Sequence, residues 1–432
     1  MNKSGRKISR QARELFNFFS GSGARGGYLA AIDQGIISAS NFLATIILAR
    51  SVSPTELGVY AVGFIILRLV RAIQDGIIVQ PMNAYGAPMT EARFKRYATS
   101  TSLIQISMAL VMSVTAALGG WLLIETGNDT AGPALFALWA PILLWQLQEY
   151  LRRMMYARGK ILNAAINTSI SNGVRLGILI WWAYHEQLTG VTGLYAIALG
   201  ALFAILPGVW QTRRYWSRKF YNLHLTFLRN WRFGGWIAGG NVLTWLSFEF
   251  YPVLTAGLIS FAAAGAYRAL QNLVAPIHTL LRAIDTYITP RAARMYREQG
   301  LPALNRTLCR TYIIAGIPTA GLLLLAIVFR TQLLELFYGN TYLDYAQGVF
   351  LIVIFYALTY LYWPLQIVLK AARKSQPIFY ASAAATLVMA TFGVLMILRW
   401  DVYGTIAGQA VNALVTTLIL YAAWKRFSKE SS

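Results

Sequence analysis

The fold is decided by VTGLYAIALGALFAILPGVW at residues 191–210, which is followed by QTRRYWSRKFYNLHLTFLRNWRFGG at residues 211–235. The first segment has no charged side chain and, as an α-helix, is long enough to cross the roughly 30 Å hydrocarbon core of a membrane. The second segment carries six Arg and Lys residues and no acidic residue. We therefore expect the chain to be built from membrane-spanning helices joined by short connections, some of them strongly basic.

Eleven further apolar stretches of similar length can be marked, five before this one and six after it. Hydrophobic residues make up 57% of the chain and charged residues 12%, a composition typical of membrane proteins. We predict an all-α, polytopic membrane protein. Its roughly twelve transmembrane helices are expected at residues 28–49, 57–80, 100–124, 133–155, 161–184, 191–210, 236–258, 264–287, 308–329, 347–369, 377–398 and 403–424.

The basic residues alternate between the connections that join these stretches. Arg50, Arg330 and Arg399 lie in odd-numbered connections and five other basic residues lie inside the apolar stretches. The remaining 30 of the 38 Lys and Arg residues lie in the two tails and the even-numbered connections. Because short basic loops stay in the cytoplasm, this asymmetry predicts that both termini are cytoplasmic.

The net charge of +22 does not indicate a nucleic-acid partner, because it is spread over seven short segments and no DNA-binding motif is present. Such segments instead face anionic membrane lipids. There is no nucleotide-binding loop of the Walker type, no nucleophile elbow and no metal-binding pair of histidines. We therefore expect no enzymatic activity, no cofactor and no metal.

The predicted helices divide into two sets of six. An amphipathic cytoplasmic segment at residues 1–27 precedes a first lobe at 28–210, and residues 236–432 form a second lobe with a short cytoplasmic tail. Gly58-Val59-Tyr60 recurs as Gly265-Ala266-Tyr267, which favours an internal duplication over chance similarity. Because both sets start in the cytoplasm, the repeats would be parallel, with a substrate path between the lobes.

The segment between the lobes, residues 211–235, has an amphipathic pattern. Its aromatic and aliphatic residues recur at helical spacing, and basic residues occupy the rest of the helical wheel. We predict a helix that lies on the cytoplasmic membrane surface, with an ordinary charged loop as the alternative.

Some ionisable residues in the predicted helices have a possible partner one turn away. Arg71 can pair with Asp75, and Arg282 can pair with Asp285. Arg268 lies near the outer end of its stretch, where its side chain is expected to reach the membrane surface.

Four charged residues have no such local partner: Asp33, Arg68, Arg175 and Glu249. Since charge inside a membrane is costly, each must meet another helix or a water-filled cavity. The cationic surplus favours a cavity that binds an anion through Arg68 and Arg175, with Arg71 and Arg282 as further candidates. The alternative is structural pairing between helices, such as Asp33 with Arg68 or Arg71.

Asp33 and Glu249 are the candidates for coupling or gating. Glu249 lies beside Pro252, and a carboxylate without a partner at such a site can exchange protons during a rearrangement. A hydrogen-bonded structural acid is the alternative for Glu249.

Several motifs keep a characteristic order along the chain: Asn41-Phe42 leading to Ala49-Arg50, SPTELGVY at 53–60, QEYLRR at 148–153, YARG at 156–159, and GAYRA at 265–269 closed by Pro290. With these motifs the chain resembles, over nearly its whole length, the polysaccharide flippases of the multidrug/oligosaccharidyl-lipid/polysaccharide exporter superfamily. The resemblance implies a bilobed transporter of the bacterial inner membrane with a cationic central cavity.

By the same resemblance, the substrate would be an undecaprenyl-diphosphate-linked oligosaccharide, moved to the outer leaflet by alternating access for O-antigen, capsule or exopolysaccharide synthesis. Membrane lipids, a polysaccharide polymerase and export machinery would be its other partners. Members of this family hold the pyrophosphate with cavity arginines, and guanidinium groups suit that role because they bind phosphate bidentately and stay charged.

Three other functions remain open from the sequence. A multidrug or organic-cation antiporter of the same superfamily would need acidic residues at the centre of the first lobe. A membrane glycan polymerase or ligase would need a larger external domain. A non-transporting scaffold of a polysaccharide export complex would have no polar cavity.

Overall fold

The computed structural model describes the backbone of residues 22–374 and 376–430, and the side chains of 28–281, 288–289, 291–292, 294–374 and 376–429. Every regular element in this described part is a helix, which confirms the all-α prediction. Of the predicted segment at residues 1–27, residues 1–21 lie outside the described part.

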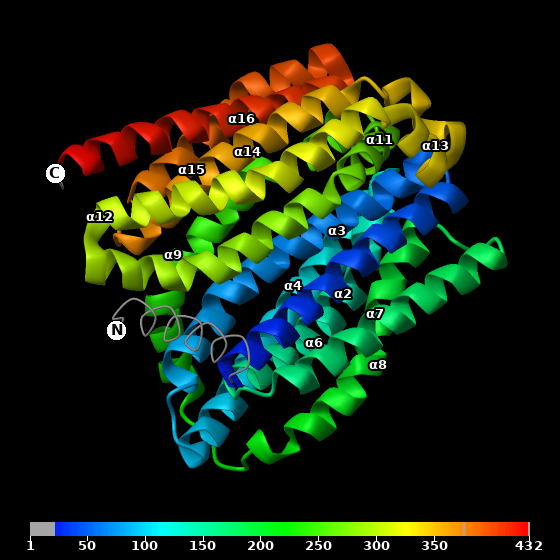
Figure 1. The fold of residues 1–432 in the computed structure, drawn as a ribbon. Coiled ribbons are helices and arrows are strands. Elements are labelled where there is room, and N and C mark those ends of the chain that lie inside the picture. Colours follow the sequence, from blue (N-terminus) through cyan, green and yellow to red (C-terminus); the bar gives the residue numbers. More distant parts are fainter. Residues whose placement is uncertain (1–21, 375, 431–432) are drawn as a thin grey trace, which may run out of the picture.

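The first half of the chain forms long helices joined by short turns (Figure 1). These are α2 (Ser22–Ser51), α3 (Pro54–Gln74) with π-helical turns at Asp75–Val79 and Met82–Gly86, α4 (Glu91–Glu125), α5 (Ala131–Ala137), α6 (Trp139–Ala157), α7 (Ile161–Tyr184) and α8 (Gly190–Thr212).

The second half follows the same pattern. It contains α9 (Leu223–Phe248), α10 (Tyr251–Leu258), α11 (Phe261–Leu273), α12 (Ala275–Val328), α13 (Arg330–Tyr338), a 3₁₀ segment at Gly339–Tyr345, α14 (Gly348–Ala371), α15 (Gln376–Val388), a π-helical turn at Met389–Gly393 and α16 (Val394–Glu430). Gly300 in α12 and Asp401 in α16 have φ angles of 76° and 53°, so the chain breaks there and each helix consists of two rods.

The segment at residues 211–235 is not the single surface helix that the amphipathic pattern predicted. It forms a 3₁₀ turn at Arg213–Tyr215, a non-helical stretch at 216–222, and the start of α9. The hydroxyls of Thr99 and Ser100 on α4 accept the backbone N–H groups of Ser217 and Tyr221, at 3.0 and 2.8 Å, which holds the stretch extended. Asn222 then caps the N-terminus of α9.

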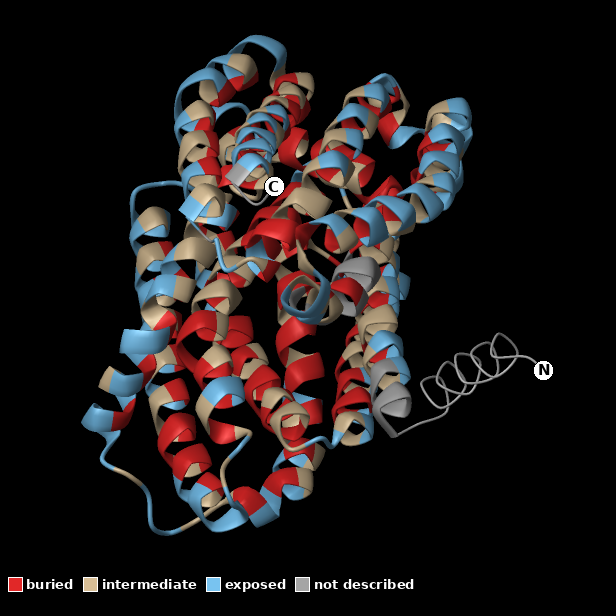
Figure 2. Ribbon diagram, turned by 60° about the vertical axis from the view of Figure 1, so that its left-hand side comes forward, coloured by how far each residue is buried: buried red, intermediate tan, exposed pale blue. Residues whose placement is uncertain are grey.

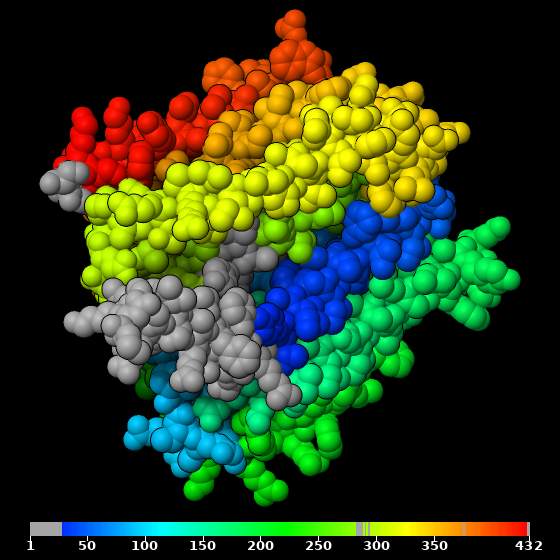
Figure 3. Space-filling model, in the orientation of Figure 1, coloured from blue at the N-terminus to red at the C-terminus, as the bar shows by residue number. Residues whose placement is uncertain are grey.

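Helices α2 to α8, blue to green in Figure 1, form one group on one side of the molecule. Helices α9 to α16 form the second group, and its members α12 to α16, yellow to red, lie on the other side. Helix α3 packs against both α9 and α11 where the two groups meet. On the face shown in Figure 3, α12 lies alongside α2, with which it is in contact.

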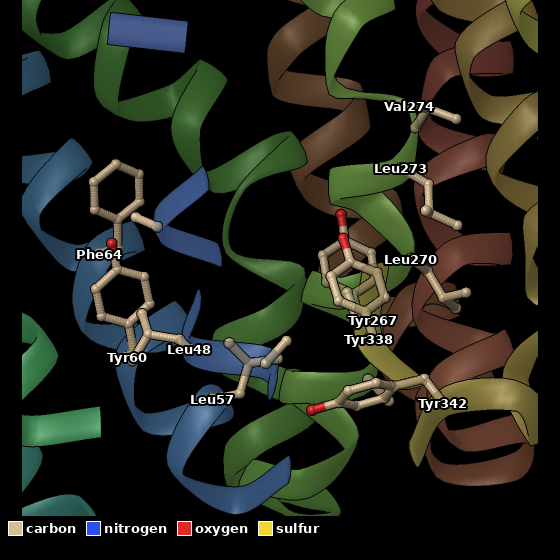
Figure 4. Close-up of a cluster of buried hydrophobic side chains, with 14 of the residues drawn as sticks. Leu48, Leu57, Tyr60, Phe64, Tyr267, Leu270, Leu273, Val274, Tyr338 and Tyr342 are labelled. Carbon is tan, nitrogen blue, oxygen red and sulfur yellow. The ribbon is translucent and has the colours of Figure 1, made fainter. Parts of the chain in front are cut away.

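A buried hydrophobic cluster joins the two groups at one end of the molecule (Figure 4). Leu48, Leu57 and Tyr60 from the first half and Leu270 and Tyr342 from the second half belong to this one cluster, and each is at most 1% exposed. This end of the molecule is therefore sealed by apolar packing.

Two glycines bring α3 and α11 together at the sealed end. A Cβ atom added to Gly58 would lie 1.7 Å from the carbonyl oxygen of Phe261, and one added to Gly265 would lie 2.2 Å from that of Pro54. These are corresponding positions of the recurring Gly-Val-Tyr and Gly-Ala-Tyr motifs. Only the absence of a side chain allows the two backbones to approach this closely.

The outward faces of the helices are exposed (Figure 2). Many large apolar side chains are among the exposed residues, as expected for contact with lipid. By length and composition, six helices of the described part could cross a membrane. Helices α3, α6, α7 and α9 are not among these six. Each of these four helices contributes polar residues to the site described below.

Candidate functional site

A cavity of about 1340 Å³ lies between the two groups of helices. Both groups line it, through α2, α3, α6 and α7 on one side and α9, α11, α12, α14, α15 and α16 on the other. The lining residues of α2 fall at 34–42, those of α3 and its π-helical turn at 64–75, and those of α14 at 355–370. The other halves of these helices belong to the apolar seal. The cavity thus lies towards the helix ends that join the basic connections.

The described cavity wall has a net positive charge. Six of its side chains are basic and three are acidic: Arg68, Arg71, Arg152, Arg175, Arg268 and Lys370 against Asp75, Glu149 and Glu249. Several of these charges neutralise one another, so the partners of each decide what the cavity can bind.

Arg175, on α7, is 6% exposed and reaches the end of the cavity next to the seal. Its Nη1 donates to Oδ1 of Asn41 and its Nη2 to the hydroxyl of Tyr60, both at 3.0 Å. Its Nε is buried without a hydrogen-bond partner among the described residues, and no described carboxylate forms an ion pair with it. Among the described residues, Arg175 thus has polar neighbours and no counter-charge.

Arg268, on α11, is a second cavity arginine without a carboxylate partner among the described residues. Its Nη2 is 3.4 Å from the hydroxyl of Thr45, and its guanidinium lies 5.5 Å from the centre of the Phe64 ring. The expectation that Arg268 would reach the outer membrane surface is wrong. The tight approach of α3 and α11 beside it turns its face of α11 inward, into the cavity.

The two arginines lie against the same pair of helices. Arg175 binds Asn41 of α2 and Tyr60 of α3, and Arg268 contacts residues one turn further along both helices. The rings of Tyr60 and Phe64 stack with centroids 6.1 Å apart. The guanidinium groups therefore approach one region of the cavity from opposite groups of helices.

Arg68 and Glu249, both predicted to lack a local partner, pair with each other. Nη2 of Arg68 lies 2.5 Å from Oε1 of Glu249, with side-chain exposures of 32% and 28%. Arg68 is on α3, and Glu249 lies where α9 ends, so the ion pair links the two groups of helices. The premise that Glu249 is an unpartnered carboxylate is therefore wrong, although its Oε2 has no hydrogen-bond partner among the described residues.

A buried ion network lies nearer the open end of the cavity, around Glu149 of α6. Glu149 accepts from Arg71 at 2.8 Å, from Arg152 at 2.8 and 2.9 Å, and from Arg153 at 2.6 Å. Arg152 also lies 2.5 Å from Asp33 of α2.

Two predicted pairings are therefore replaced. Arg71 meets Glu149 on a neighbouring helix, whereas Asp75 accepts from Gln80 at 3.1 Å. Asp33 pairs with Arg152 and accepts from the hydroxyl of Tyr156, and not from Arg68 or Arg71. The spacing of residues in the sequence identifies possible partners only within one helix. Partners on different helices depend on how the helices pack.

Arg282 lies in α12, within the part of that helix whose side chains are outside the described residues. Aromatic and amide side chains cover much of the remaining cavity wall, among them Trp145, Trp245, Tyr356, Asn172 and Gln409. Among the described residues, no group of three or more His, Cys, Asp and Glu side chains could hold a metal ion.

The sequence profile of the polysaccharide biosynthesis protein family matches residues 47–347. The chain belongs to this family. The predicted resemblance is thereby confirmed at the level of the family. No curated protein matches the sequence.

Solved structures show which fold this family member has. A multidrug resistance transporter of the MATE family and the MOP superfamily, in an inward-facing conformation, aligns over 92% of this chain and 96% of its own, with a TM-score of 0.75 and 16% identity. The lipid II flippase MurJ, in an inward closed conformation, aligns over 91% and 87%, with a TM-score of 0.70 and 12% identity.

A third similar structure is a MOP superfamily transporter from Pyrococcus furiosus, described as having a binding pocket of reversed polarity. It covers 94% of both chains with a TM-score of 0.66 and 14% identity. At these identities the likeness establishes the fold alone, which this chain shares with these MOP superfamily transporters.

Proposed function

We propose that the protein is a flippase that moves an undecaprenyl-diphosphate-linked oligosaccharide across the bacterial inner membrane for surface polysaccharide synthesis. The observation that carries this proposal is the pair of cavity arginines, Arg175 and Arg268, that lack a carboxylate partner among the described residues. Family membership and the transporter fold agree with it.

We infer twelve crossings arranged as two six-helix lobes, residues 28–210 and 236–432, with both termini in the cytoplasm. Twelve rods result when α11 continues into the first rod of α12, α15 continues into the first rod of α16, and α5 and α9 continue into α6 and α10. The basic connections lie at the ends of the rods nearest the open cavity. On the positive-inside rule, the structure is then an inward-facing state, ready to accept substrate from the cytoplasm.

The diphosphate group would bind between Arg175 and Arg268. A buried guanidinium without a counter-charge is costly, and a ligand that brings about two negative charges into the cavity offsets that cost. Both arginines can donate to phosphate oxygens bidentately, one from each lobe. A diphosphate held in this way would draw the lobes together, which is what a change of access requires.

Arg68 would join the substrate site only when it leaves Glu249. An ion pair of two partly exposed groups contributes about 0–1 kcal/mol, so the substrate can displace Glu249 from Arg68 at little cost. Glu249 would then be free to gate or couple the movement of the lobes. Arg71 and Arg282 stay further candidates, the first already engaged by Glu149.

The oligosaccharide would lie along the aromatic and amide side chains of the wall. Trp145, which is partly exposed, offers a flat apolar face for a sugar ring, and the partly exposed amide of Asn172 offers a donor and an acceptor for hydroxyls. The cavity of about 1340 Å³ is large enough for several sugar units.

An organic-cation antiporter is the second candidate, because MATE transporters share the fold. The net positive wall disfavours it, since a cation would meet two arginines where the ligand should bind. A scaffold without transport would need no such cavity.

The proposal is tested in cells whose surface polysaccharide depends on this protein. Arg175→Ala should abolish surface polysaccharide at wild-type protein level, and Arg175→Lys should restore it only in part because the bidentate geometry is lost. Arg399→Ala, which removes an exposed charge far from the cavity, is the matched control. Normal polysaccharide with both Arg175→Ala and Arg268→Ala would overturn the anion site.

A further inference from the structure

A second, smaller pocket lies where α6 ends, α7 begins and α8 runs into the 3₁₀ turn. Its volume is about 260 Å³, and its wall includes Lys160, Arg213 and Arg214. All three side chains are exposed, so a ligand can approach from outside the molecule. The pocket shares no residue with the central cavity.

The three cations also lack an acidic partner in the part of the chain that the structure describes. None of them forms an ion pair with a carboxylate of the described residues. Arg213 lies over the ring of Trp210 at 4.7 Å, and Arg214 lies over the ring of Tyr215 at 4.8 Å. Stacking on a ring fixes the plane of a guanidinium and leaves donors at its edge for an anion.

The N-terminus of α7 adds a second source of positive potential. This helix of 24 residues begins at Ile161, directly after Lys160, without a side-chain cap and without an acidic residue in its first turn. Its first backbone N–H groups therefore carry the uncompensated positive end of the helix dipole. Asn163, in the same turn, lines the pocket.

The pocket also offers a hydrogen-bond acceptor. Oε1 of Gln211 is buried without a hydrogen-bond partner among the described residues, and Gln211 lines the pocket. A phosphodiester has no proton to donate to this oxygen, whereas the hydroxyls of a glycerol attached to it do. Trp210 is 63% exposed at the rim, as is common for aromatic residues at a membrane interface.

We propose that this pocket binds the phosphodiester headgroup of an anionic phospholipid of the phosphatidylglycerol type. Lys160, Arg213 and the α7 N-terminus would hold the phosphate, and Gln211 would accept from the glycerol hydroxyl. Basic pockets between helices on the cytoplasmic side of a membrane are suited to lipid headgroups. The bound lipid would join the end of α8 to the start of α7 at the base of the first lobe.

The test uses the full-length protein in nanodiscs and counts retained lipids by native mass spectrometry. Wild-type protein should retain phosphatidylglycerol in preference to phosphatidylcholine. The double variant Lys160→Gln/Arg213→Gln should lower the apparent affinity for phosphatidylglycerol about tenfold or more, since each cation near the surface adds to lipid attraction. Arg218→Gln/Lys219→Gln removes the same charge from exposed residues outside the pocket and should change it less than about threefold.

Each other outcome decides against the proposal. Equal losses in the two double variants would mean general attraction to the basic surface. Equal retention of the two lipids by wild-type protein would mean no headgroup site. Displacement of the retained lipid by millimolar inorganic phosphate, as complete as by soluble glycerol phosphate, would assign the pocket to free phosphate.

Discussion

Replacing Gly58 with alanine should destabilise the sealed state of the protein and favour the state that is open on the opposite side. The added Cβ would lie 1.7 Å from the carbonyl oxygen of Phe261, whereas ordinary contacts of this kind begin at 3.4 Å. Because the carbonyl oxygen of Phe261 is a backbone atom, no side-chain rotation can relieve the clash, and α3 and α11 would have to separate. Overpacking of this kind costs about 1–3 kcal/mol, and a shift of about 2 kcal/mol between two states changes their ratio about thirtyfold.

A glycine with open space around it provides the control for a general effect of replacing glycine with alanine. Gly239, on the exposed face of α9, has no atom within 4 Å of an added Cβ. Within a helix, alanine is favoured over glycine by about 0.5–1 kcal/mol, so Gly239→Ala should be neutral or stabilising. Gly58→Ala would gain the same helix stability if its Cβ did not clash with Phe261.

Cysteine accessibility measures the shift. Ser38 lines the cavity and can be replaced by cysteine in a Cys309→Ser background, which removes the exposed natural thiol. In the Gly58→Ala variant, a membrane-impermeant maleimide added outside intact cells should label Ser38→Cys at least tenfold faster than in the Gly239→Ala control. Equal labelling rates, with both variants folded and inserted, would refute the reasoning that Gly58 closes the outer side.

Further substitutions test other parts of the account. Gly265→Ala should act in the same direction as Gly58→Ala in the labelling assay, because it opens the same contact from the other helix. Arg152→Ala should lower stability by about 3–5 kcal/mol in detergent unfolding, since it leaves buried Glu149 short of a partner; the half-buried Arg153→Ala should cost about 1 kcal/mol or less. Glu249→Gln should change stability by less than about 1 kcal/mol and make transport insensitive to a proton gradient, and unchanged sensitivity would exclude the coupling role.

The membrane fold could be predicted because each apolar run and each basic connection can be recognised from its own residues. A run such as residues 191–210 has to cross a bilayer or be buried, and the basic residues that follow it orient the chain. The linker was harder to predict. Its helical pattern is present, but hydroxyls of α4 hold residues 217 and 221 extended, and that contact cannot be read from the linker itself.

The candidate site was predictable only in part, because interhelical distances are absent from a sequence. Arg175 could be singled out since no acid lies one turn away from it. Arg68 satisfied the same test, yet its partner is Glu249, about 180 residues further along the chain. Arg268 was missed because its closeness to a helix end suggested an exposed position. Its polar neighbours at i+3 and i+4, Gln271 and Asn272, were the signal that this face lines a cavity.

The most direct measurement is transport by purified protein in proteoliposomes. A fluorescent undecaprenyl-diphosphate-linked oligosaccharide, placed in one leaflet, should cross to the other at a rate that Arg175→Ala and Arg268→Ala each reduce at least tenfold. Arg399→Ala should transport at the wild-type rate. An organic cation such as ethidium should not be moved, because the cavity wall presents two arginines without a described counter-charge. Movement of ethidium without movement of the lipid-linked diphosphate would contradict the account.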